Sequence, residues 1–254
     1  MRVSIGYNRK QQHATAYKSS TARFGDLVSG YYATQSSDPE SQGVGTRMVG
    51  VSHNLSTGSS IHTGTWSNVM VQGNGYFNIE AVNGDTLFSR DGTFRVDKDG
   101  FLVNIQGNKV LGVLGTDNPV GANPVEIPIE LDPGDPLYTS YEINKNGQIF
   151  GTPQSGGAKV QIGTLSITTF PNPEGLIRNG SNMYYQGSEA GDPINSGGGI
   201  GQAGNIISGA IEGSNVDLAE QMVNMIIYQS DYTANSKAIS TASNMLETVV
   251  NLIR

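Results

Sequence analysis

The stretch WSNVMVQGNGYFNIEAVNGDTLFSRDGTFRVDKDGFLVNIQGNKVLGVL, residues 66–114, decides the fold class. Short runs of alternating apolar residues are separated by glycine-containing pairs, among them Asn83-Gly84, Asp91-Gly92 and Asp99-Gly100. Such pairs tolerate the positive φ that a two-residue hairpin turn requires. The stretch therefore predicts a meander of antiparallel strands connected by two-residue turns.

The same pattern continues toward the C-terminus through VEIPIEL, through EINKNGQIFGT with its Asn146-Gly147 pair, and through AKVQIGTLSITTF. Glycine is abundant, with 34 residues, whereas aromatic residues make up only 7% of the chain. This composition is typical of many tight turns between short strands around a thin core. We expect a hairpin-rich antiparallel β domain over residues 66–190.

The segments on either side of this domain have a different composition. Residues 1–65 are polar and rich in Ser, Thr and Gly, which predicts an N-terminal arm that is extended or loosely structured, with short helix or strand pieces. Residues 191–214 contain few apolar anchors and predict a Gly-rich linker followed by an extended piece.

The last segment, residues 215–254, contains no proline and no glycine. Ser214 or Asn215 is a suitable helix cap, and Asp217 and Glu220 lie in the first turn, where the helix dipole favours acidic side chains. At about 1.5 Å per residue, a helix here reaches roughly 55 Å. The predicted fold class is mainly β with a long C-terminal α-helix.

Counting in sevens from Leu218 finds an apolar residue at every step of this helix. An apolar stripe kept over five heptads is typical of a coiled-coil seam, although polar side chains crowd it between Gln229 and Lys237. The helix could instead pack along its own β domain, but its length exceeds the size of such a domain. We therefore expect an assembly interface between chains. Its predicted residues are Leu218, Met222, Met225, Tyr228, Tyr232, Ile239, Ala242, Leu246, Val249, Val250 and Ile253.

Three separated motifs resemble one family. SNVDLAEQMVNMIIYQSDYTANSKAIS, followed by the ending VVNLIR, resembles the C-terminal segment of bacterial flagellar hook and distal-rod proteins. MVQGNGYFNIE and LFSRDGTFRVDKDGFLVNIQGNKVLG resemble the hairpin-rich domain of the same family, and VQIGTLSITTFPNPEGLIRNGSNMYYQ resembles the end of that domain. The motifs stand in the family's order and cover residues 66–254.

The resemblance implies a structural subunit that assembles helically with copies of itself into the axial tube of the flagellum, as hook or distal rod. Such a subunit transmits motor torque, leaves a central export channel, and uses no cofactor and no catalytic residue. The implied partners are neighbouring rod, hook or junction proteins and the flagellar export apparatus. The chain start lacks the apolar core of a cleavable secretory signal, so we expect export to the flagellum without one.

The N-terminal region departs from the family pattern. The family normally begins with a helix of about thirty residues that ends in a conserved motif, and only residues 15–18, Thr-Ala-Tyr-Lys, are similar to that motif. Ala16 stands where the motif has glycine. We expect an atypical arm without the long N-terminal helix, which leaves the C-terminal seam more dependent on neighbouring chains.

Composition argues against several other functions. The net charge of −7 offers no basic face to nucleic acid, and no run approaches the roughly 18 apolar residues of a membrane span. There is no cysteine for a disulfide or a thiolate metal site. We expect neither nucleic-acid binding nor membrane insertion.

Motifs that suggest ligand sites have simpler explanations. The glycines of GIGQAG (Gly199, Gly201 and Gly204) lack the preceding strand and following helix of a dinucleotide site, and we interpret them as linker. DKDG (97–100) lacks the remaining ligands of a calcium loop, and the three histidines have no spaced ligand partner.

The alternative function is a secreted carbohydrate-binding or hydrolytic β domain with a helical oligomerisation tail. Sugar-binding sites usually need exposed aromatic side chains, and the single tryptophan, Trp66, gives this alternative little support.

Overall fold

The computed structural model describes residues 15–28, 43–115, 121, 124–129, 138–154 and 156–252. The chain divides into two compact units. One unit, here called the β domain, comprises His13–Ser19 and His53–Asn215. The other, here called the terminal unit, comprises Met1–Gln12, Ser20–Ser52 and Val216–Arg254.

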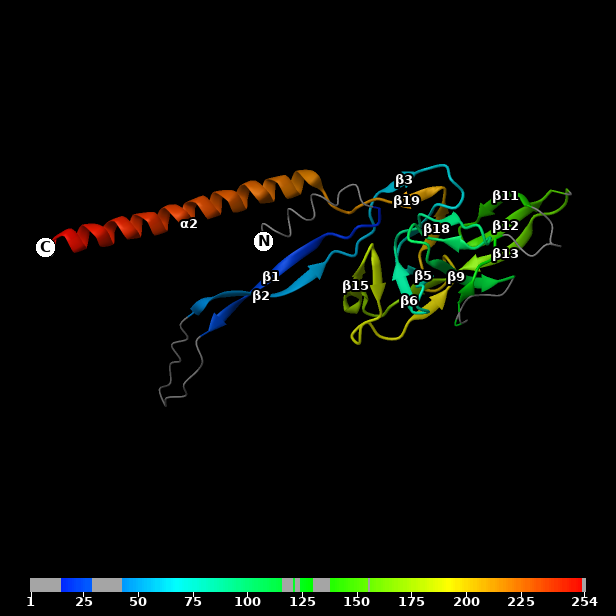
Figure 1. The fold of residues 1–254 in the computed structure, drawn as a ribbon, viewed down its shortest axis with the longest axis horizontal. Coiled ribbons are helices and arrows are strands. Elements are labelled where there is room, and N and C mark those ends of the chain that lie inside the picture. The colour runs from blue at the N-terminus through cyan, green and yellow to red at the C-terminus, as the bar shows by residue number, and fades with distance from the viewer. Residues whose placement is uncertain are drawn as a thin grey trace. The chain divides into compact units, whose positions relative to one another are not determined.

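The elements are mostly short strands, followed by one long helix (Figure 1). The terminal unit contains β1 (Ser20–Val28), β2 (Gly43–His53) and α2 (Leu218–Leu252). The β domain contains β3 (Ser60–His62), β4 (Val69–Gln72), β5 (Tyr76–Glu80), β6 (Thr86–Ser89), β7 (Arg95–Val96), β8 (Leu102–Val103), β9 (Lys109–Leu114), β10 (Val125–Glu126), β11 (Tyr138–Ile143), β12 (Gln148–Pro153), β13 (Val160–Leu165), β14 (Ile167–Thr169), a 3₁₀ turn η1 (Pro173–Gly175), β15 (Ile177–Gly180), β16 (Met183–Tyr185), β17 (Ile194–Ser196), β18 (Asn205–Ser208) and β19 (Ala210–Glu212).

An antiparallel sheet organises the β domain. Its main path runs β11-β12-β13-β9-β5-β6-β16-β15, with β10 and β8 also on β9 and with β14 between β5 and β17. Two further antiparallel pairs, β18 with β4 and β19 with β3, join late strands to early ones. The prediction of a mainly antiparallel β fold with one long C-terminal helix is confirmed.

The hairpin loops at Asn83-Gly84, Asp99-Gly100 and Asn146-Gly147 contain three residues rather than the predicted two. Between β5 and β6, the Ala81 amide donates to the Asp85 carbonyl (2.9 Å) and the Gly84 amide donates to the Ala81 carbonyl (2.8 Å). Gly84 has φ +84°, so a turn is followed by one left-handed residue, an arrangement that fits the twist of paired strands. The same two backbone bonds recur at residues 97–101, 104–108 and 144–148.

Asp91-Gly92 is not a hairpin turn, and this prediction is wrong. The Gly92 carbonyl accepts a hydrogen bond from the Val69 amide (3.0 Å). A Cβ on Gly92 would lie 1.8 Å from the Val69 carbonyl oxygen and 3.1 Å from the Phe77 ring. Glycine is therefore required here because two backbone segments approach each other closely.

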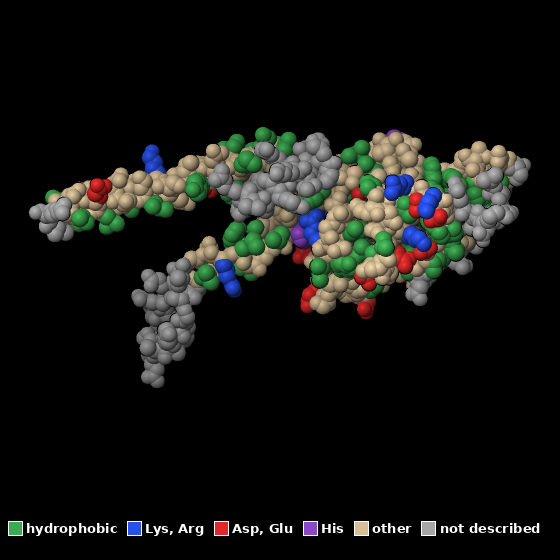
Figure 2. Space-filling model, viewed as in Figure 1, with side chains coloured by type: hydrophobic (Ala, Val, Ile, Leu, Met, Phe, Trp, Pro, Cys, Tyr) green, Lys and Arg blue, Asp and Glu red, His purple; other side chains and the backbone are tan. Residues whose placement is uncertain are grey.

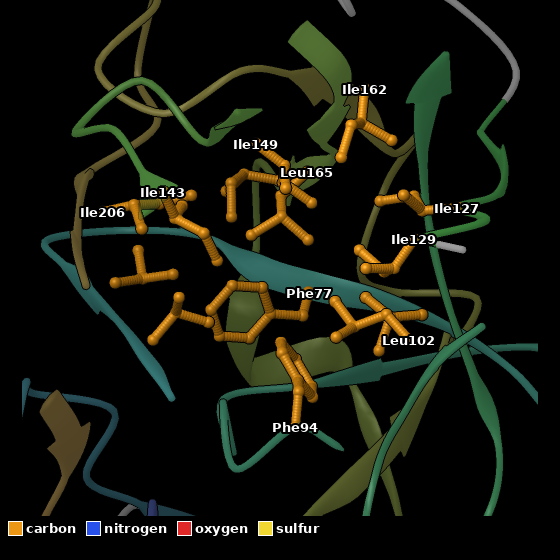
Figure 3. Packing of buried hydrophobic residues seen from close by; sticks show 14 of the residues in the cluster. Phe77, Phe94, Leu102, Ile127, Ile129, Ile143, Ile149, Ile162, Leu165 and Ile206 are labelled. Atoms are coloured by element: carbon orange, nitrogen blue, oxygen red, sulfur yellow. The ribbon is translucent and has the colours of Figure 1, made fainter. Parts of the chain in front are cut away.

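The core of the β domain is assembled from strands far apart in the sequence. Phe77 lies at its centre, completely buried, with Phe94 against its ring at 5.1 Å between centroids (Figure 3). Isoleucine and leucine side chains surround this pair, and fully buried members include Leu102, Ile127, Ile129, Ile149, Leu165 and Ile167. A second, smaller cluster contains Tyr76, Phe88 and Phe170. The β domain thus buries its own apolar residues.

Residues 191–214 do not form the predicted linker. They contain β17, β18 and β19, and Ile206 from β18 belongs to the main core. Gly204 is needed for contact rather than for flexibility, because a Cβ there would lie 2.3 Å from the Gln72 carbonyl oxygen. The segment is therefore an integral part of the β domain.

Residues 1–65 contain more regular structure than the predicted arm, namely β1, β2 and β3. Residues 15–19 belong to the β domain, where Ala16, Tyr17 and Lys18 are buried. Residues 1–14 and 29–42 lie outside the described residues. The β1–β2 pair exposes several large apolar side chains, which are Phe24, Leu27, Met48, Val49 and Val51.

Replacing Gly92 with alanine tests the close contact in the core. We expect Gly92→Ala to lower the free energy of unfolding of the β domain by at least about 2 kcal/mol, because the added carbon overlaps a backbone carbonyl that cannot move away. Urea titration followed by Trp66 fluorescence measures the change. Gly157→Ala is the matched control, since nothing lies within 4 Å of its added carbon. Equal unfolding midpoints for the two variants would contradict the assignment.

Candidate assembly interface

The helix α2 begins at a different cap from those predicted. One carboxylate oxygen of Asp217 accepts hydrogen bonds from the amides of Ala219 (2.8 Å) and Glu220 (3.4 Å). The Asn215 side chain is used elsewhere, because its oxygen accepts from the Ser19 amide and its NH₂ group donates to the Asn54 carbonyl. Asp217 therefore satisfies the free amides of the first turn and places a negative charge at the positive end of the dipole.

The polar stretch in the middle of α2 does not break the helix. The Ser236 hydroxyl donates to the Tyr232 carbonyl, and the Thr241 hydroxyl donates to the Lys237 carbonyl, both at 2.9 Å. Thr248 makes the same bond to Asn244. These hydroxyls bond to carbonyls of the preceding turn, which helical geometry allows. The helix consequently continues for 35 residues, or about 52 Å at 1.5 Å per residue.

No residue of α2 is buried in the single chain. Among the predicted interface residues, Leu218, Met225 and Tyr228 are half-buried. The others are exposed, from 49% at Met222 to 72% at Ile239 among the large side chains. They comprise Met222, Tyr232, Ile239, Ala242, Leu246, Val249 and Val250. Ile253 lies outside the described residues.

The helix also carries apolar residues that the heptad count missed. Val223, Ile227, Met245 and Leu252 are all exposed, with Leu252 at 80%. With about 3.6 residues per turn, Val223 and Ile227 lie on the side of the helix opposite the predicted seam, whereas Met245 and Leu252 lie beside the seam residue Val249, four residues before it and three after it. Figure 2 shows hydrophobic side chains at intervals along both edges of α2. The spacing of four between Val223 and Ile227, and of seven between Met245 and Leu252, was the signal in the sequence.

The charge of α2 is low for an exposed helix. Its 35 residues include only Glu220, Asp231, Lys237 and Glu247 as charged side chains. A surface helix normally opposes its apolar side with a charged one. Two apolar sides and few charges allow close packing against other helices with little like-charge repulsion. Burial of each large apolar side chain would contribute about 1.5–3 kcal/mol.

The described residues include no group of three or more acidic or histidine side chains that could hold a metal ion. Within the same residues, α2 falls short of the apolar length that crossing a membrane requires. The GIGQAG glycines connect β17 to β18, and DKDG is the β7–β8 hairpin loop. His13 lies outside the described residues.

Two family models match the chain. Residues 70–151 match the flagellar hook protein FlgE/F/G D1 domain, and residues 207–252 match the C-terminal region of flagellar basal body rod FlgEFG proteins. The first range covers about half of the β domain, from β4 into β12, and the second covers β19 and α2.

Full-length relatives are similar over nearly the whole chain. The chain is 30% identical to the flagellar basal-body rod protein FlgG of Borreliella burgdorferi, covering 99% of this chain and 92% of that protein. It is 31% identical to FlgG of Bacillus subtilis, covering 98% and 92%. It is 22% identical to the flagellar hook protein FlgE of Escherichia coli, covering 98% and 95%.

Removing the cap of α2 tests how this helix begins. We expect Asp217→Ala to speed hydrogen exchange at the Ala219 and Glu220 amides by about fivefold, for a cap that contributes ~1 kcal/mol. Asp217→Asn keeps an oxygen acceptor and should leave both rates within about twofold of the parent. Nuclear magnetic resonance of the amides provides the rates. Identical exchange in the two variants would show that another residue caps the helix.

Proposed function

The chain belongs to the family of flagellar hook and basal-body rod proteins, and we propose that it assembles helically with copies of itself into the tube of the flagellar axis. It is a structural axial subunit of the flagellum. The observation that carries the proposed mode of assembly is α2, a helix of 35 residues without a buried side chain and with apolar residues along its length.

Helical assembly follows from the kind of contact that α2 offers. A contact between two different surfaces of identical subunits repeats without limit, and it yields an open helix when the rotation does not close. Near its start, α2 has apolar residues on two opposite sides, which provide such a pair of surfaces. The seam residues from Leu218 to Val250 would meet Val223 and Ile227 of a neighbour, and Met245 and Leu252 would widen the seam toward the end of the helix. A layer of helices built this way would surround a central channel.

The β domain has a different task in this proposal. Its core is complete within one chain, so it folds before assembly and presents a fixed surface to neighbours. The helical layer would carry the motor torque along the tube, because continuous helix packing resists twisting. Neighbouring rod, hook or junction proteins would extend the tube at its ends. The export apparatus would deliver the chain to the flagellum without a cleaved signal.

Between the two axial structures, similarity favours the rod. Identity to FlgG proteins reaches 30–31% over 260–264 aligned positions. Alignment with the hook protein of Escherichia coli extends over 392 positions at 22% identity, which requires large insertions relative to the 254 residues of this chain. We therefore favour a rod subunit over a hook subunit.

The alternative, a carbohydrate-binding or hydrolytic domain, finds little support. Sugar-binding surfaces use exposed aromatic rings, whereas the single tryptophan, Trp66, is half-buried and stacks on Tyr141 at 4.7 Å between ring centroids. Trp66 also packs against the main core. We propose no catalytic role for the chain.

A charge on the seam tests the proposed interface. Leu246→Asp should abolish polymerisation, because an unpaired carboxylate cannot be buried between apolar helices. Sedimentation and electron microscopy at rising protein concentration measure assembly, and Trp66 fluorescence shows that the β domain stays folded. Asn244→Asp adds the same charge on the polar side of the same turn and should assemble like the parent. Normal filaments from Leu246→Asp would exclude the seam as the assembly element.

A further inference from the structure

Three charged side chains meet in the interior of the β domain. Lys18, Arg90 and Glu212 are at most 4% exposed. The Lys18 ammonium lies 2.5 Å from one oxygen of the Glu212 carboxylate, and the Nε atom of Arg90 lies 3.1 Å from the other oxygen. The two contacts join residues separated by 194 and 122 positions in the sequence.

Backbone groups complete the hydrogen bonding of this cluster. The Gly58 amide donates to the Glu212 carboxylate (2.8 Å), and the Lys18 ammonium donates to the Ser56 carbonyl (2.7 Å). Arg90 donates from Nη1 to the carbonyls of Gly73 (2.7 Å) and Gly75 (2.6 Å). Buried charges persist only when their hydrogen-bonding capacity is met in this way.

The cluster holds two cations and one anion. Burial lowers the pKa of the Lys18 ammonium, and the nearby Arg90 guanidinium lowers it further, whereas Glu212 opposes both effects. Apolar side chains of the same size, in place of the charged ones, could give the β domain similar stability. The ionic cluster therefore contributes something other than stability alone. Its contribution is a specific pairing, because the single carboxylate of Glu212 offers one oxygen to each of the two cations.

The cluster lies where the polypeptide passes between the β domain and the terminal unit. Residues 15–19 lead directly into β1, and residues 212–215 lead toward α2; these two stretches are here called the root segments. Backbone hydrogen bonds join them, from the Ala16 amide to the Glu212 carbonyl (2.8 Å) and from the Asn215 amide to the Tyr17 carbonyl (3.3 Å).

A third stretch of backbone reinforces the root segments. The Asn54 amide donates to the Ser19 carbonyl (2.9 Å). The Asn215 side chain donates to the carbonyls of Asn54 (2.8 Å) and Ser56 (3.2 Å), and it accepts from the Ser19 amide (2.8 Å). At Ser19, Asn54 and Asn215, the stretches by which the described chain leaves the β domain are thus bonded to one another beside the same charged cluster.

We propose that the Lys18–Glu212–Arg90 cluster is a clasp, which fixes the two root segments to each other and to the β domain. The clasp prevents either root segment from peeling away while the core stays folded. In an assembled axis, it passes load between α2 and the β domain, a role that rests on the proposed function. Lys18 and Glu212 join the root segments, and Arg90 anchors them to the hairpin-rich sheet.

Lys18→Met is the decisive variant. It removes one cation and leaves Arg90 and Glu212 as a balanced pair, so the β domain should stay folded. We expect exchange at the Ala16 and Asn215 amides to rise at least about tenfold, while the Ile79 and Leu165 amides of the core are unchanged. Filaments of this variant should show a shorter persistence length in electron micrographs.

Lys109→Met is the matched control. It removes a lysine from the ion pair with Glu126, which is partly exposed and far from the root segments in the sequence. This variant should leave the exchange rates of Ala16 and Asn215 and the filament stiffness as in the parent. Glu212→Gln extends the test, because it leaves two buried cations without their anion and should open the root segments further than Lys18→Met.

The outcomes separate the clasp from the proposed function. Unchanged exchange at Ala16 and Asn215 in Lys18→Met overturns the clasp, and so does global unfolding of that variant, since the cluster would then determine the fold. Faster exchange with unchanged filament stiffness overturns its role in carrying load. Failure of the parent chain to polymerise contradicts the proposed function, while the exchange rates still decide whether the root segments are clasped.

Discussion

The constraint on which this structure depends is the apolar surface of α2, which a single chain leaves exposed. Across 35 residues, α2 has no buried side chain, although large apolar residues such as Ile239, Leu246 and Val249 lie along one side of it. Isolated helices gain little from backbone hydrogen bonds alone, and in proteins the packing of an apolar side supplies most of their stability. If α2 is the assembly interface that we propose, stability and association are coupled in it, because the contacts that stabilise the helix are then the contacts between copies.

The β domain has the opposite character. Phe77, Leu102, Ile149 and Leu165 are completely buried within a single chain, and late strands β18 and β19 close on early strands β4 and β3. The structure thus joins a domain that buries its own core to a helix whose apolar residues are exposed. The charged cluster of Lys18, Arg90 and Glu212 belongs to the β domain and lies close to the points where the chain continues into β1 and α2.

Local patterns in the sequence predicted the hairpins and the C-terminal helix. Contacts between residues distant in the sequence determined how the glycines and the segment before the helix are used. The Asn83-Gly84 and Asn146-Gly147 pairs marked true hairpins, because the glycine conformation is a local requirement. The role of Gly92 and the incorporation of residues 191–214 depended on distant partners, Val69 and Gln72, which no local pattern reveals.

The same distinction holds for the candidate interface. The heptad count identified one side of α2 because its period is local, but counting only sevens missed Val223 and Ile227 on the other side. The cap moved to Asp217 because distant backbone groups engage Asn215. The pairing of Lys18 with Glu212 spans 194 positions and has no signature in either local sequence. That the seam residues meet in the assembled axis remains a prediction.

Hydrogen exchange of the intact chain across a range of protein concentrations tests the central claim most directly. If copies cover α2, its amides exchange rapidly in dilute protein and become protected as concentration rises, whereas amides of β5 stay protected throughout. Protection of α2 that is already complete at the lowest concentration, in a chain that sediments as a monomer, would contradict the account.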